Sequence, residues 1–113
     1  MKKYIFIVTD RNRNNLHVGL SADILKTMDF YKKMPSLCFD NSNQLTRLVY
    51  FEELKDEASA SIRFNLINSF TRRQKEKVVR AVNTDWTDLT MALKHEHIIP
   101  NVRLSQHVLS FAS

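Results

Sequence analysis

Apolar and polar segments alternate along this chain, and three of the apolar runs have the composition of β-strands. Tyr4–Val8 is a continuous aromatic and β-branched run, which predicts a buried strand. Residues 10–15 are polar and suited to a turn, so Leu16–Leu20 is expected to return beside the first strand as a hairpin. Thr46–Glu53, with Leu-Val-Tyr-Phe at its centre, predicts a third strand.

Three further segments carry apolar residues at helical spacing. Ser21 is suited to cap the first helix, which is expected over residues 22–33. Residues 56–68 predict a second helix, and the capping box in Thr71–Gln74 starts a third over residues 71–82. The apolar positions of the second helix are Ala58, Ile62, Leu66 and Ile67.

The order β-β-α-β-α-α predicts the α+β class, with a three-stranded antiparallel sheet flanked by helices and a helical C-terminal extension. A length of 113 residues suits one compact domain. Pro100 fits the first turn of a final helix in the extension. The apolar residues there could dock on the domain or join two copies into a homo-oligomer through residues 100–111. These residues are Val102, Leu104, Val108, Leu109 and Phe111.

Gly19 is the sole glycine, where average usage near 7% would give about eight. A chain that otherwise avoids glycine has a reason to keep one. Glycine accepts a positive φ angle, and it permits a close approach that a Cβ would block. We expect one of these two features at Gly19, and we assign Trp86 a structural role in the core.

Cations outnumber carboxylates by 17 to 12, and the net charge of +5 favours anionic partners. The cations are densest in residues 71–80, where Glu76 is the one carboxylate. Several of them share a helix face, which suits the regularly spaced phosphates of nucleic acid. The alternative is a solvated face with a Glu76–Arg80 pair. The candidate nucleic-acid-binding residues are Arg72, Arg73, Lys75, Lys77 and Arg80.

Cys38 is the single cysteine, which excludes an internal disulfide and favours a reducing, cytoplasmic location. No apolar run approaches the roughly 20 residues of a membrane-spanning helix, so no membrane association is expected. His95 and His97 invite a metal site, but further ligands are not close in sequence and a polar loop is the default expectation. No metal and no cofactor are therefore predicted.

Several of these motifs, taken in order, resemble the GIY-YIG nuclease domain found in small bacterial proteins and at the N-terminus of the bacterial excinuclease. Tyr4-Ile5-Phe6 and His17-Val18-Gly19 are similar to the family's two strand motifs. Leu48–Glu53 resembles its Leu-Val-Tyr-Tyr-Glu-Glu strand, and the basic helix that begins at Thr71 follows in the expected place. Asn83–Leu89 resembles the Asn-Pro-Glu-Trp-x-Asp-Leu segment that closes the small members.

The resemblance covers residues 3–89 as one domain and leaves residues 90–113 outside it. It implies a fold that hydrolyses DNA with one divalent metal. Such a reaction needs an activated water, a cation facing the developing charge, and a carboxylate that holds the metal. Other side chains stand at the family's catalytic positions here, so we assign no catalytic residue. They are Phe6 and His17 for two tyrosines, Thr27 for an arginine and Phe64 for a glutamate.

Two functional hypotheses follow from the sequence. In the first, a non-catalytic, nuclease-like protein binds DNA, another nucleic acid or a protein partner. In the second, a divergent Mg²⁺-dependent endonuclease uses relocated residues. His17 would then act as the general base, and a carboxylate nearby would hold the metal. The candidate carboxylates are Glu52, Glu53 and Glu57.

Overall fold

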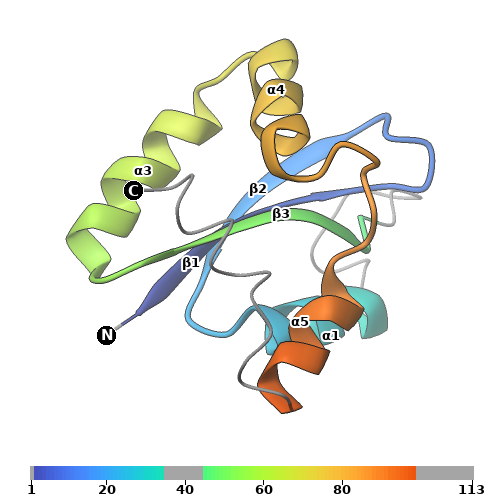
Figure 1. Cartoon of the computed structure of the whole chain (residues 1–113). Helices are drawn as coiled ribbons and strands as arrows, with labels where there is room; N and C mark the ends of the chain where they lie inside the picture. The colour runs from blue at the N-terminus through green and yellow to red at the C-terminus, as the bar shows by residue number, and fades with distance from the viewer. Residues whose placement is uncertain (1, 35–44, 99–113) are drawn as a thin grey trace.

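Three antiparallel strands form the central sheet of the computed structural model, which describes residues 2–34 and 45–98 (Figure 1). The strands are β1 (Lys3–Thr9), β2 (Leu16–Ser21) and β3 (Arg47–Leu54), in the order β2-β1-β3. The helices are α1 (Ile24–Lys33), α3 (Glu57–Asn68), α4 (Arg72–Val82) and α5 (Thr90–Ile98). The predicted α+β class and three-stranded antiparallel sheet are confirmed.

Helices cover both faces of the sheet. Figure 1 shows α1 and α5 on one side and α3 and α4 on the other. Side chains alternate along β1, so Phe6 and Val8 pack in the layer of α1 and α5, while Ile5 and Ile7 pack in the layer of α3 and α4. All four are at most 1% exposed. Burial on both faces explains why this strand is a continuous apolar run and not an alternating one.

The first helix begins at Ile24 and is capped by Asp23, so the prediction of Ser21 as its cap was wrong. The Asp23 carboxylate accepts a hydrogen bond of 3.2 Å from the backbone N–H of Lys26. Ser21 instead ends β2, and its hydroxyl accepts a bond of 2.9 Å from the N–H of Asp23. Both side chains can accept a hydrogen bond from a nearby backbone N–H, so composition alone does not separate them.

The second predicted helix is present as α3, but the apolar positions that predicted it do not all face the sheet. Ile62 is 71% exposed and Leu66 is 47% exposed, whereas Ile67 is fully buried. The helix turns Ala60 and Phe64 toward the sheet instead. Its apolar residues lie on more than one side, so hydrophobic pattern alone does not fix its rotation.

Gly19 lies opposite Phe6 in the β1–β2 pairing, and its φ angle is not positive. The ring of Phe6 lies across the glycine. A Cβ built at Gly19 would come within 2.6 Å of Cε2 and 2.7 Å of Cε1 of that ring, with Cζ closer still. The structure therefore shows the second of the two features expected of a lone glycine, a close approach.

The polar loop expected around His95 and His97 is wrong for the backbone, which is helical over Thr90–Ile98. Leu93 of this helix is 6% exposed and joins the core cluster of α1. The side chains of residues 95–98, Cys38, and the helix expected after Pro100 lie outside what the structure describes. No helix in the described ranges is long and apolar enough to span a membrane.

Candidate nucleic-acid interface

Helix α4 presents the predicted basic face. Thr71 caps it in the predicted box, in which Gln74 N–H donates to the Thr71 hydroxyl and Thr71 N–H donates to Gln74 Oε1. Val78 and Val79 are buried against the sheet. The cations lie on the remaining sides of the helix, four of them exposed and Lys75 half-buried. The four are Arg72, Arg73, Lys77 and Arg80.

Glu76 engages two of these cations. Its carboxylate lies 3.0 Å from Arg72 and 3.3 Å from Arg80, both pairs one helical turn apart. Exposed pairs of this kind contribute at most about 1 kcal/mol. Within the described residues no carboxylate pairs with Arg73 or Lys77. The solvated-face interpretation thus accounts for two of the four exposed cations and leaves the other two, Arg73 and Lys77, available.

The Asp10 carboxylate holds the loop of the β1–β2 hairpin together through three hydrogen bonds. It accepts bonds from Asn12 N–H at 3.1 Å, Asn14 N–H at 2.8 Å and Asn15 Nδ2 at 3.1 Å. Slight burial opposes ionisation, but the hydrogen bonds outweigh it and lower the pKa of Asp10. These bonds confirm the polar turn, and Arg13 within it has a left-handed φ of 60°.

Arg72 ties this loop to the start of α4. Its guanidinium donates to the main-chain oxygens of Arg13 and Asn14, 59 and 58 residues away in sequence. The Arg13 side chain in turn donates to the Asp85 carbonyl at 3.3 Å and lies 5.4 Å above the ring of Trp86. Three segments therefore meet here: the hairpin loop, the first turn of α4 and the segment that follows α4.

The segment after α4 is anchored to the sheet by Asn83. Its amide donates to the carbonyls of Val49 and Thr87, both at 2.9 Å, and its oxygen accepts from Thr87 N–H at 3.1 Å. Trp86 is 5% exposed and packs in the core cluster of α3 and α4. Its backbone has a φ of 56°, so the two non-glycine residues with positive φ in the described ranges, Arg13 and Trp86, contact each other.

Three of the four positions that match the nuclease family lie on α1 or on the side of the sheet that it covers, and Phe64 lies on the other side. Phe6 is buried on the α1 side of the sheet, while Phe64 packs against the cluster on the opposite side. His17 and Phe6 each lie 6.1 Å, between ring centroids, from Tyr31 of α1. Thr27, one turn before Tyr31, shares a hydrogen bond of 2.7 Å with Ser21.

His17 is half-buried, and its environment favours the neutral imidazole. Burial is the larger cause and the positive charge of Lys75 is the second, and together they lower the pKa of His17 below 6.5. Its ring meets Tyr31 edge to face, with 76° between the ring planes. Lys75 of α4 therefore acts on His17 electrostatically, which the sequence did not indicate.

The carboxylates proposed for a relocated metal site point apart. Glu52 is fully buried, and its Oε1 lies 2.7 Å from Arg63 Nε while Tyr50 donates its hydroxyl to Oε2. Burial, followed by the bond to Glu52, raises the pKa of Tyr50. Glu53, on the other face of β3, accepts from the Tyr4 hydroxyl at 3.0 Å. Successive strand residues face opposite sides, so these carboxylates cannot converge on one ion.

Glu57 lies in the exposed first turn of α3, where it favours the helix dipole. Within residues 2–34 and 45–94, no group of three His, Cys, Asp or Glu side chains is placed to hold a metal ion. Glu52 and Glu53 form ion pairs with Arg63 and Lys2 instead.

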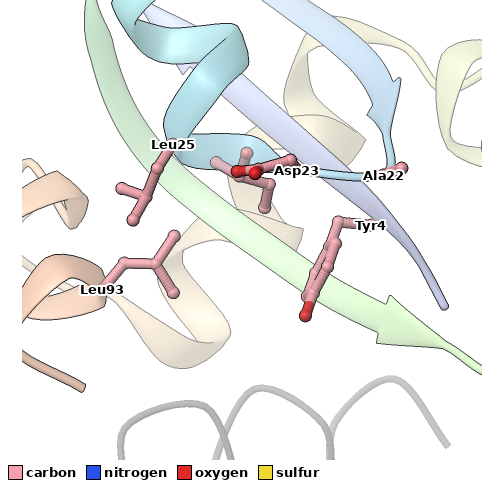
Figure 2. A pocket seen from close by; sticks show the side chains of 6 residues that line it. Tyr4, Ala22, Asp23, Leu25 and Leu93 are labelled. Carbon is pink, nitrogen blue, oxygen red and sulfur yellow. The ribbon is translucent and has the colours of Figure 1, made fainter. Parts of the chain in front are cut away.

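A small hollow of about 110 Å³ lies beside the first turn of α1, on the side of the sheet away from α4. Figure 2 shows Tyr4, Leu25 and Leu93 around it. Its remaining lining residues are Ala22, Asp23 and Ile24. The sequence did not predict this hollow, nor did it place the hairpin arginines in the basic surface. The signal for the latter was present, since Arg11 and Arg13 stand in the polar turn of a basic chain.

No protein-family model matches this sequence, and no curated protein matches it. The fold is similar to the solution NMR structure of the UPF0213 protein BH0048 from Bacillus halodurans. The TM-score is 0.51 and the sequence identity 17%, over 80% of this chain and 95% of that chain. The chain therefore shares the fold of that protein, an antiparallel three-stranded sheet flanked by helices.

Proposed function

We propose that this protein is a non-catalytic member of the nuclease-like fold that binds nucleic acid through α4. The observation that carries the proposal is the pair Arg73 and Lys77, which no carboxylate neutralises within the described residues. The buried contacts of Val78 and Val79 fix the rotation of the helix and hold this face toward solvent. Exposed cations on a rigid element are what a phosphate backbone recognises.

The absence of catalysis is proposed from side-chain chemistry. Phe64 offers no oxygen to a metal and packs against the core, and Thr27 carries no charge to face a phosphate. Glu52 would have to leave Arg63 before it could bind a metal ion. Breaking a buried pair of this kind costs about 3–5 kcal/mol.

One observation favours the endonuclease alternative. His17 is held neutral by burial and by Lys75, and a neutral imidazole is the form that accepts a proton from water. In that alternative Mg²⁺ would need carboxylates other than Glu52. A second alternative, a protein-interaction module, is favoured by the exposed Ile62 and Leu66 on α3.

A binding titration and a cleavage assay test the proposal. A fluorescein-labelled DNA duplex should bind at low salt, and the logarithm of its affinity should fall linearly with the logarithm of salt concentration. Arg73→Gln with Lys77→Gln should flatten that slope by up to about two units. The matched control is Lys26→Gln with Lys32→Gln, which removes the same charge from exposed positions on α1.

Supercoiled plasmid should remain intact when the protein is added with Mg²⁺ or Mn²⁺. Nicking that co-purifies with the protein and disappears in His17→Gln would establish the endonuclease alternative. If the duplex does not bind at low salt, or if the α4 and control variants behave alike, the α4 proposal is wrong.

A further inference from the structure

We infer that the hairpin loop is the second half of this surface, and that Arg11 and Arg13 contact phosphates beside those bound by α4. The inference rests on the proposed function and adds residues from a different segment of the chain. The bonds from Arg72 to the carbonyls of Arg13 and Asn14 join the loop to α4. Because of them, the hairpin loop with its arginines lies beside the first turn of α4, 59 residues further along the chain.

The contacts of Arg13 fix its position and leave N–H donors available to an anion. Its backbone adopts the left-handed conformation, which is unfavourable for a non-glycine residue, so the surrounding contacts must favour it. The Trp86 ring lies under the guanidinium and the Asp85 carbonyl takes one N–H. A guanidinium has five N–H donors. Apart from the N–H that binds the Asp85 carbonyl, those of Arg13 make no hydrogen bond within the described part of the chain, so they can donate to phosphate oxygens.

Two carboxylates near this surface are already engaged, while that of Asp85, whose main-chain carbonyl binds Arg13, is exposed. Asp10 accepts three hydrogen bonds inside the loop, and Glu76 lies between Arg72 and Arg80. They therefore oppose an approaching phosphate less than free carboxylates would. Arg11 is exposed and makes no ion pair with any residue that the structure describes.

The surface fits the phosphate backbone of a duplex better than a single strand. Single-strand binding proteins stack bases on exposed aromatic rings. Trp86 is 5% exposed and Arg13 lies over its ring. The one exposed aromatic residue in the described ranges is Phe30, which lies on α1 across the sheet. This surface therefore offers charge and hydrogen-bond donors without a stacking platform.

Trp86 is the sole tryptophan, so its emission reports directly on this junction. When an unlabelled mixed-sequence DNA duplex is titrated in, we expect the emission to change with the same midpoint and salt dependence as the binding measured with labelled duplex. Arg11→Gln and Arg13→Gln should each flatten the salt slope by about one unit. The Lys26→Gln and Lys32→Gln pair should leave the slope and the emission change as in the parent.

The Arg11 side chain makes no hydrogen bond or ion pair with the described residues, so its variant tests the inference even if Arg13→Gln disturbs the loop. Binding that depends on Arg73 and Lys77, without an emission change and without an effect of Arg11→Gln, would leave the α4 proposal standing and overturn the role of the hairpin. Equal affinity for a single strand of the same length and salt would overturn the duplex preference. A duplex that fails to bind at all would refute the α4 proposal itself.

Discussion

Replacing Gly19 by alanine should destabilise the protein, although alanine in a strand usually does the opposite. The φ angle at Gly19 is not positive, so alanine can adopt the backbone conformation. On that ground alone the substitution would stabilise by about 0.5–1 kcal/mol, because it restricts the unfolded chain. The structure predicts the other sign because of the ring that lies across the glycine.

The magnitude follows from the contact with Phe6. Carbon atoms in favourable contact lie about 3.5–4.0 Å apart, and the new methyl group would meet Cε2 at 2.6 Å and Cε1 at 2.7 Å. Cζ would come closer still, so the ring must move by more than about 1 Å, yet Phe6 is 1% exposed and packed among the residues of α1. Overpacking of this kind costs about 1–3 kcal/mol. After the backbone gain, we expect a net loss of about 1–2 kcal/mol.

Urea unfolding of Gly19→Ala, Phe6→Leu and the double variant measures this loss and assigns its cause. In a thermal unfolding experiment, each kcal/mol lost from the free energy of unfolding should lower Tm by about 4 °C in a chain of this size. Leucine at position 6 leaves room for the methyl group, so Gly19→Ala should cost little in that background. A coupling energy of about 1–2 kcal/mol is expected between the two sites. Additive effects, or a Gly19→Ala protein as stable as the parent, would refute the steric explanation.

Two further predictions concern buried and half-buried polar groups. Arg63→Met leaves the Glu52 carboxylate buried without its cation, and it should lower the free energy of unfolding, measured in urea, by about 3 kcal/mol. Adding Glu52→Gln to the same chain should recover part of the loss. An unchanged urea midpoint in Arg63→Met would contradict this prediction. The pKa of His17 is lowered in the folded state, so the unfolded chain binds more protons below about pH 6.5. Stability should therefore fall as the pH drops through that range, and His17→Gln should make the unfolding midpoint less dependent on pH there, whereas identical pH profiles would exclude this role.

Local pattern predicted much of the fold because the signals were local. The continuous apolar run of β1, the polar turn and the Thr71–Gln74 capping box each depend on residues close together in sequence, and each is present. The basic face of α4 followed from spacing alone. A lone glycine also indicated a special contact, although sequence did not say which neighbour made it.

The remaining features depend on which segments meet in space. The rotation of α3 is one, since Arg63 finds Glu52 on β3 and turns Ile62 outward. The approach of the Phe6 ring to Gly19 depends on the pairing of β1 with β2. Neither contact can be predicted from the spacing of apolar residues along the chain, because each depends on a partner residue that lies on another element.

The candidate interface also combines features that the sequence determined with features that only the tertiary structure shows. Sequence determined that α4 would be capped, amphipathic and basic, because those properties reside within the helix and the one residue before it. Only the tertiary structure showed that Arg72 is used to hold the hairpin loop, and that Arg13 lies over Trp86 across 73 positions of chain. The sequence shows that a side chain is charged, but it does not show whether that side chain is free or already hydrogen-bonded. Its availability to a phosphate is decided by the carbonyls and carboxylates that folding brings within reach.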